Sequence, residues 1–191
     1  MRGLHKKQAK KKKGFRMQYL KLHLQGFVQH YSCQSNLVTA PSSTYYKTEK
    51  HPTKKAVIGM IGAAMGLPRK SDGLQRLNDS LDIKYRTLKQ GSVLADFQTA
   101  QPLRDDEPFP IANGKTKKDG KIIKTVEYLQ DYRFEVYVGG EADLLDKIYS
   151  AFQNPYYNPY LGKKSCFPTR PFITDRQLVS LEDMKNVYDC T

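Results

Sequence analysis

The chain has 191 residues, a formal net charge of +13 and 39% hydrophobic residues. This length suits one domain with a hydrophobic core, and the excess of Lys and Arg favours an anionic partner such as RNA, DNA or a membrane surface. No stretch of the sequence has the roughly 20 apolar residues that a membrane span needs, and the basic start lacks the apolar segment of a signal peptide. We therefore expect a cytoplasmic protein that does not bind a membrane.

The basic residues are distributed unevenly. Eight of the 32 Lys and Arg residues lie in the first sixteen positions, which contain no acidic residue, so removing them lowers the net charge from +13 to +5. We expect residues 1–16 to form a disordered basic extension. The three cysteines, Cys33, Cys166 and Cys190, lack the spacing of a zinc site and are typical of a reducing compartment. The sequence predicts no metal site and no cofactor.

The first regular element is a strand at residues 17–26, where Leu20, Leu22 and Leu24 alternate with polar positions. The following segment, 27–52, is polar and has no sustained period. We expect a long ordered loop there, and loops of that length are usually functional or disordered.

A helix is predicted over residues 53–67, with Thr53 as its N-cap and a broad apolar face. Its three glycines, Gly59, Gly62 and Gly66, each cost about 1 kcal/mol relative to alanine in a helix. We expect this cost to be offset by close packing of the helix on a sheet.

Further elements follow in the order short helix, two strands and an irregular arm. The helix is predicted at 72–81, and the strands at 82–88 and 93–101 are expected to form a hairpin through Lys89–Ser92. Residues 102–124 break the pattern with three prolines, Asx-Gly turn signals and five lysines. Such a composition favours a projecting loop or arm.

Strand alternation returns at 126–140, and helical spacing of apolar residues follows at 141–152. The order of elements predicts an α+β fold of the ferredoxin-like kind, an antiparallel sheet with helices on one face. We assign residues 17–175 to this domain, with the arm inserted at about 102–124, and make no structural prediction for 176–191.

Lysines adjoin aromatic residues at two turns of the chain. The first cluster precedes the helix at residue 53 and contains Tyr45, Tyr46, Lys47, Lys50, Lys54 and Lys55. The second contains Tyr156, Tyr157, Tyr160, Lys163 and Lys164. Rings for stacking and cations for phosphates are typical of single-stranded RNA binding, although a solvated loop is the simpler interpretation of either cluster alone.

Five segments occur in order between Met17 and Pro171: LQGFVQHY, HPTKKAVIGMIGAAMGL, DFQTAQ, EYLQDYRFEV and NPYYNPYLGKKSC. Together they resemble the CasD-type subunits of type I-E CRISPR Cascade complexes. The resemblance implies a modified RRM-like fold with a thumb-like hairpin arm. It also implies a noncatalytic RNA-binding subunit that caps the 5′ end of CRISPR RNA by gripping its repeat-derived handle. The implied protein partners are a backbone subunit and the large subunit that reads the PAM, with target DNA contacted at most indirectly.

The resemblance also implies which residues contact RNA. Lys163 and Lys164, held by the Gly162 corner and supported by Tyr160, are expected to hold handle phosphates, and Ser165 to add a hydroxyl contact. The other expected RNA-binding residues are Gln29, His30, Tyr45, Lys50, Thr53, Lys54, Lys55 and Gln98. Within the arm, the expected contact residues are Arg104, Lys115, Lys117, Lys118 and Lys121.

Two alternatives remain open at this point. Relatives in type I-C systems are metal-independent endoribonucleases that cut the CRISPR repeat with a tyrosine and a Lys-His pair. Here Tyr46, Lys50 and His51 would be the candidates, because Lys50-His51 is the only adjacent Lys-His pair in the body of the chain. A generic basic RRM-like protein, without preference for the handle, is the other alternative.

Overall fold

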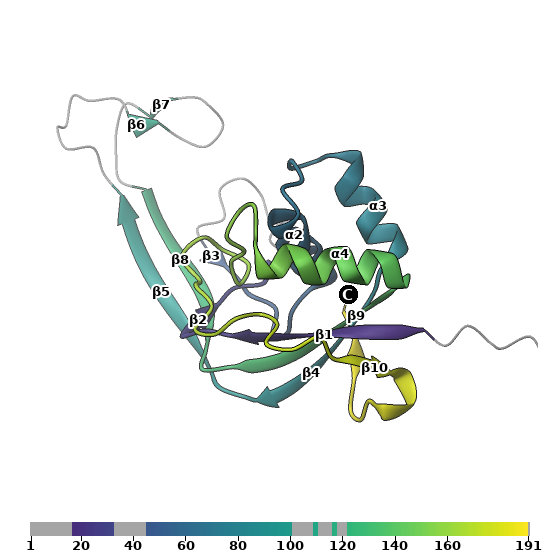
Figure 1. Ribbon diagram of the computed structural model, residues 1–191. Coiled ribbons are helices and arrows are strands. Elements are labelled where there is room, and N and C mark those ends of the chain that lie inside the picture. Colours follow the sequence, from purple (N-terminus) through teal and green to yellow (C-terminus); the bar gives the residue numbers. More distant parts are fainter. Residues whose placement is uncertain (1–16, 33–44, 101–108, 111–115, 118–121, 191) are drawn as a thin grey trace, which may run out of the picture.

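The computed structural model describes residues 17–32, 45–100, 109–110, 116–117 and 122–190 (Figure 1). Its centre is a five-stranded antiparallel sheet in the order β10-β1-β9-β4-β11. The strands are β1 (Gln18–Gln25), β4 (Asp82–Lys89), β9 (Arg133–Gly140), β10 (Leu178–Ser180) and β11 (Tyr188–Asp189). Helices α2 (Lys54–Ala64), α3 (Asp72–Ser80) and α4 (Ala142–Gln153) lie on one side of this sheet. The predicted α+β class, with helices on one face of an antiparallel sheet, is confirmed.

The core lies between the sheet and the helices. Leu20, Leu22 and Leu24 of β1 are buried there with Ile61 of α2 and Ile148 of α4. Because side chains of a strand alternate between faces, the period-two leucines direct one face of β1 to the helices. Burying each such side chain contributes about 1.5–3 kcal/mol relative to leaving it in water.

The glycines of α2 do not pack against the sheet, so that expectation is wrong. A Cβ atom on Gly62 would lie 2.2 Å from Cδ2 of Leu74, which shows that Gly62 lets α3 approach. Gly66 follows the helix end with a φ of +74° and lies against the ring of Tyr156. A Cβ atom on Gly59 would meet nothing within 4 Å, so this position faces open space.

The predicted hairpin of residues 82–101 is also wrong. β4 pairs with β9, whereas β5 (Ser92–Ala100) pairs with β8 (Ile122–Gln130) from Ser92 opposite Gln130 to Ala100 opposite Ile122. Residues 82–100 and 122–140 therefore form one long bent hairpin, whose outer half projects from the sheet as the expected thumb-like arm (Figure 1).

The arm begins earlier in the chain than predicted, because β5 and β8 belong to it. Its far end carries the short strands β6 (Phe109–Pro110) and β7 (Thr116–Lys117). Residues 126–140, expected as one strand, are two strands separated at Asp131, whose φ is +59°. Gly91 lies at the matching bend, where a Cβ atom would be 1.9 Å from the carbonyl oxygen of Gln130.

Part of the expected loop at 27–52 joins the arm. The two-residue strands β2 (Val28–Gln29) and β3 (Tyr45–Tyr46) both pair with β8, the first antiparallel and the second parallel. These pairings bring the first lysine-aromatic cluster to the base of the arm, beside the sheet.

Residues 169–190 run along both edges of the central sheet. His23 N donates to Phe172 O (2.7 Å), and Thr169 N donates to Gln25 O (2.9 Å), before β10 pairs with β1. A 3₁₀ turn (Leu181–Asp183) leads to β11, which pairs with β4.

The division of the chain into domains stays a prediction, and the predicted extension at 1–16 lies outside the described residues. No helix in the described part of the chain is long and apolar enough to span a membrane.

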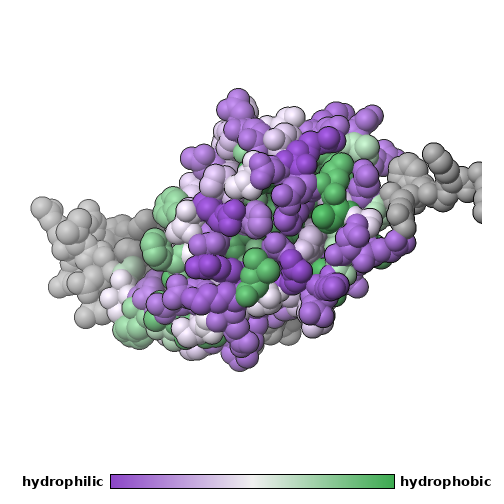
Figure 2. All heavy atoms as spheres, turned by 60° about the horizontal axis from the view of Figure 1, so that its bottom comes forward, coloured by the Kyte–Doolittle hydropathy of each residue, from purple (hydrophilic) through white to green (hydrophobic). Residues whose placement is uncertain are grey.

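The outer face of the sheet, away from the helices, is polar. Figure 2 views the molecule from this side, where hydrophilic residues predominate and hydrophobic ones form separate patches. Glu135 of β9 lies at the centre of an ion cluster: its carboxylate accepts from both Nε (3.1 Å) and Nη2 of Arg86 and from the Tyr137 hydroxyl (2.7 Å), with Lys21 Nζ 3.9 Å away. The charges of this cluster are therefore paired within the protein.

Candidate nucleic-acid interface

The turn at residues 159–166 is held by its two apolar ends. Leu161 and Cys166 are fully buried and close the turn through a hydrogen bond from Leu161 N to Cys166 O (2.9 Å). Leu161 O also accepts from His30 N (3.0 Å), which fixes the turn to the segment after β2. The intervening Gly162, Lys164 and Ser165 are exposed, so anchoring in the core presents a short polar loop at the surface.

Gly162 occupies a position that excludes other residues. Its φ is +91°, and a Cβ atom there would lie 1.7 Å from the carbonyl oxygen of His30. The predicted glycine corner therefore exists, and its cause is close contact with the His30 backbone.

Lys163 is half-buried between two aromatic rings. Its Nζ lies 5.6 Å from the ring centre of Tyr46 and 5.8 Å from that of Tyr128, within the range of cation–π attraction. Burial lowers the pKa of Lys163, and the charge of Lys124 lowers it further. A partly desolvated ammonium group repelled by another cation gains from the arrival of an anion such as phosphate.

A groove of about 1030 Å³ lies between this turn and α2. One wall is formed by Tyr157–Lys164 and the other by α2 and the segment leading to α3, with His30 and Thr53 also in the lining. Two backbone bonds fix the walls together, from Tyr156 N to Ala64 O (2.9 Å) and from Tyr157 N to Ala63 O (3.1 Å).

The charge of the groove has one sign. Its lining includes Lys55, Arg69, Lys163 and Lys164, and no Asp or Glu is among the described residues that line it. Cations gathered in a concave surface without acidic partners create a positive potential that attracts anions. The groove can therefore accommodate a phosphodiester chain.

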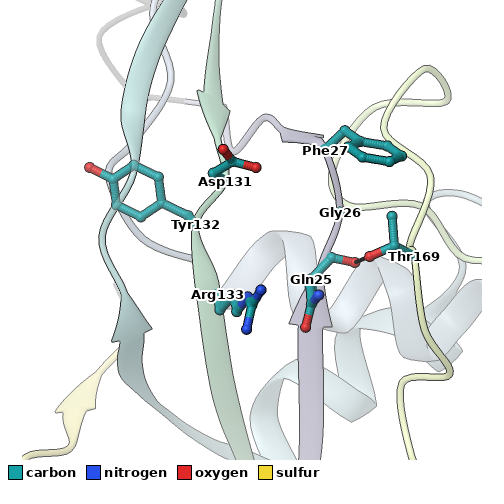
Figure 3. Close-up of a pocket in the computed structure, with 7 residues that line it drawn as sticks. All are labelled: Gln25, Gly26, Phe27, Asp131, Tyr132, Arg133 and Thr169. Atoms are coloured by element: carbon teal, nitrogen blue, oxygen red, sulfur yellow. Dashed lines mark hydrogen bonds between the residues drawn. The ribbon is translucent and has the colours of Figure 1, made fainter.

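A smaller hollow of about 290 Å³ lies where the arm bends away from the sheet (Figure 3). It is lined by Phe27, Arg133, Asp131 and Thr169, among others, and so contains both an acidic and a basic side chain. This mixture gives it no preference for an anion, in contrast to the groove beside α2.

The outer face of the sheet is a second possible platform, because RRM domains bind RNA on exposed aromatic residues of their sheets. Here Tyr19 and Tyr137 of that face are only 2% and 3% exposed. Their hydroxyls donate to Asp82 and Glu135, and burial raises the pKa of each tyrosine to about 12. Rings that are covered and hydrogen-bonded cannot stack on bases, which favours the groove.

The predicted RNA-binding residues are not all brought together. Thr53, Lys55, His30, Tyr160, Gly162, Lys163 and Lys164 line the groove. Thr53 also caps α2, since its Oγ1 accepts from Ala56 N (3.3 Å). Lys54 and Lys50 are not part of the groove lining, and Lys50 is exposed.

The side chains of Gln29 and His30 are buried and hydrogen-bonded within the protein. Gln29 is fully buried, donates to Tyr132 O (2.7 Å) and accepts from the Tyr31 hydroxyl (2.6 Å), so this placement gives its predicted RNA contact no support. The His30 ring Nδ1 donates to Glu127 O (2.7 Å), and burial lowers the pKa of His30, with the charge of Lys163 acting in the same direction. His30 thus forms a neutral wall of the groove.

Other predicted contacts lie on the arm or near it. The Tyr45 hydroxyl donates to Glu127 Oε1 (2.9 Å), and the Gln98 amide donates to Asp96. Ser165, by contrast, belongs to the turn at 159–166 and is exposed next to Lys164. Lys117 lies in β7. Arg104, Lys115, Lys118 and Lys121 lie outside the described residues.

The residues of the endoribonuclease alternative are divided between two places. Tyr46 lies beside Lys163, whereas the His51 ring stacks on Tyr85 of β4 with a centroid distance of 4.8 Å. No contact in the described part of the chain joins Tyr46 to Lys50 or His51.

Comparison with known proteins decides the family. The model of the family described as CRISPR-associated protein (Cas_Cas5) matches residues 19–188. The chain belongs to the Cas5 family. It is 30% identical over 168 residues to the CRISPR system Cascade subunit CasD of Escherichia coli (strain K12), a match that covers 81% of this chain and 69% of that protein. The resemblance to CasD-type subunits is thereby confirmed.

Solved structures agree with this Cas5 assignment. A chain of a CRISPR RNA-guided surveillance complex superposes with a TM-score of 0.70 at 29% identity, covering 84% of this chain and 64% of that one. A crystal structure of a Cas protein gives a TM-score of 0.56 at 25% identity, with 83% and 64% covered. The present chain thus spans less than two thirds of the length of either solved chain.

Three residues that contribute to this region of the Cas5 protein were not predicted as contacts. Arg69 lines the groove and follows α2 without an aromatic neighbour. Tyr128 and Lys124 act on Lys163 from outside the groove lining and belong to β8, far in sequence from Lys163. Only the pairing of β8 with β2 and β3 brings them to Lys163, so no local pattern could have found them. No group of three or more His, Cys, Asp or Glu side chains that could hold a metal ion occurs among the described residues.

Proposed function

We propose that this protein is the noncatalytic subunit of a CRISPR surveillance complex that holds the 5′ handle of CRISPR RNA. The observation that carries the proposal is the groove between α2 and the turn at 159–166, whose described lining contains four cations and no acidic residue, with Lys163 partly desolvated beside two tyrosines. The partners are the CRISPR RNA, a backbone subunit and the large PAM-reading subunit, and target DNA is contacted at most indirectly. Residence in the cytoplasm stays a prediction.

The mechanism of binding is neutralisation combined with stacking. Lys163, Lys164 and Lys55 of the groove lining hold phosphates, and exposed rings stack on bases between them. Lys163 needs little rearrangement, because Tyr46 and Tyr128 already fix its ammonium group. Pre-positioned cations reduce the entropy lost when the RNA is bound.

The test removes both lysines of the turn. A protein that neutralises Z phosphates on a single strand shows a slope of about −0.7Z in a plot of log affinity against log salt concentration. The double variant Lys163→Ala/Lys164→Ala should bind a handle RNA more weakly and flatten that slope by roughly 1–1.4 units, measured by fluorescence anisotropy. The matched control, Lys147→Ala/Lys185→Ala, removes two exposed lysines outside the groove and should leave the slope unchanged. An unchanged affinity and slope in the first variant would contradict the proposal.

The noncatalytic assignment has its own test. Incubation of the protein with repeat RNA in EDTA should leave the RNA intact, because Tyr46 and His51 lie against different partners. A single 5′-hydroxyl product that disappears in His51→Ala would show the endoribonuclease activity instead.

A further inference from the structure

The groove is lined by residues of two chemical kinds. Besides the cations Lys55, Arg69, Lys163 and Lys164, the lining contains an apolar part made by Gly59 and Ala63 of α2, Leu67, and Leu74 of α3. A nucleotide has the same division, a charged phosphate and a flat, largely apolar base. Phosphate contacts alone do not explain the apolar part.

Gly59 leaves open space within this apolar part. The position is exposed, lies within α2, and has nothing within 4 Å of where a Cβ atom would be. A glycine inside a helix is unfavourable relative to alanine, and here neither a turn nor close packing requires it. The absence of a side chain extends the groove up to the helix backbone.

The opposite wall supplies groups that suit a base. Tyr157 is 56% exposed, and among the described residues its one ring contact is a T-shaped contact with Tyr156 at a centroid distance of 4.6 Å, so the ring has exposed surface for stacking. The adjacent Asn158 offers an amide donor and acceptor, and no hydrogen bond to its side chain is found among the described residues. Exposed rings and amide groups are the means by which proteins read unstacked RNA bases.

We propose that one nucleobase of the bound single-stranded RNA leaves the path of the strand and packs against this apolar part of the groove, against Gly59 of α2 and beside Tyr157, with Asn158 contacting its polar edge. This inference rests on the proposed function, because the RNA must first be held in the groove by its cations. Gly59 is then a residue that determines access to the pocket.

The test fills the pocket without damaging the helix. Gly59→Leu should raise the melting temperature, since leucine favours a helix and meets no neighbour, yet weaken binding of handle RNA by about 5- to 150-fold, the range for loss of one base-stacking contact. Ser150→Leu, which adds the same side chain at an exposed position of α4 outside the groove, should leave the affinity unchanged. Tyr157→Ala provides a second variant that does not add bulk and should weaken binding in the same range.

An abasic scan identifies the base concerned. Handle RNAs that each lack one base should include one position whose loss weakens binding to the wild type but not to Gly59→Leu or Tyr157→Ala. If Gly59→Leu is folded and binds like the wild type, or if the wild type is insensitive to every abasic position, the pocket proposal is overturned while salt-dependent RNA binding stands. If the wild type does not bind handle RNA at all, the proposed function itself fails.

Discussion

At the scale of single residues, Gly162 determines how the turn at 159–166 packs on the core beside the groove. Gly162 lies directly over the His30 carbonyl, and His30 in turn is fixed by the arm through Glu127 O. These contacts fix the position of Lys163, the residue after Gly162. The chain cannot leave the turn in another direction without moving the His30 backbone. The position of Lys163, proposed to bind phosphate, is therefore set by backbone contacts.

Replacing this glycine should damage both stability and binding. Gly162→Ala combines a positive φ with a clash at 1.7 Å, and we expect a loss of at least about 1–3 kcal/mol in the free energy of unfolding. Gly59→Ala is the matched control and should gain up to about 1 kcal/mol. Urea denaturation measures both. Equal stability of Gly162→Ala and the wild type would show that the turn relaxes freely.

The ion cluster on β1, β4 and β9 is the dominant feature at the scale of the element. Glu135 is 6% exposed and joins three strands through Lys21, Arg86 and Tyr137. Burial alone would raise its pKa, but the hydrogen bonds from Tyr137 and Arg86 and the nearby positive charges prevail and lower the pKa below its ordinary value. The carboxylate thus stabilises the folded state as an anion.

This cluster predicts a pH-dependent effect of Glu135→Gln. A group whose pKa is lowered by folding stabilises the protein above its ordinary pKa, and that contribution is lost as the pH falls through the lowered folded pKa. The variant should be about 1–3 kcal/mol less stable at neutral pH and should approach the wild type in acid, as measured by urea denaturation across pH. Glu141→Gln, at an exposed position without a side-chain hydrogen bond, should show no such convergence. A stability difference that is constant with pH would refute the role of the charge.

At the scale of the whole molecule, the long bent hairpin of residues 82–100 and 122–140 links the core sheet to the projecting arm. Its inner half, β4 and β9, belongs to the core sheet, and its outer half, β5 and β8, projects as the arm (Figure 1). Because β2 and β3 fasten only the base of β8, the far end of the arm adds little to the core. We expect it to serve assembly with neighbouring subunits.

Shortening the arm tests whether its far end serves assembly and not stability. Ala100 lies opposite Ile122, so residues 101–121 can be replaced by Asn-Gly, a favoured two-residue hairpin turn. The melting temperature should change little, while co-purification with CRISPR RNA and the neighbouring subunits should fall markedly. Normal assembly of this variant would remove the far end of the arm from the mechanism.

Short sequence patterns correctly predicted the features that depend on neighbouring residues in the chain. The alternating leucines of β1 and the Thr53 cap of α2 follow from period and hydrogen-bonding chemistry, and both are present. The pairing of β5 with β8 instead of β4 depends on contacts more than 20 residues apart, which periodicity does not report. For the same reason the turn with Lys163 could be identified from sequence, but its partner rings Tyr46 and Tyr128 could not be assigned to it.

The strands β10 and β11 have a consequence for synthesis of the protein. They pair with β1 and β4 at opposite edges of the sheet, yet both follow every other strand in the sequence. During translation the two edges therefore stay open until residues 178–189 have left the ribosome, and open edges invite pairing between chains. Ribosomes that stall before this point would hold nascent chains ready to aggregate, so the yield of soluble protein should depend on how quickly these residues emerge.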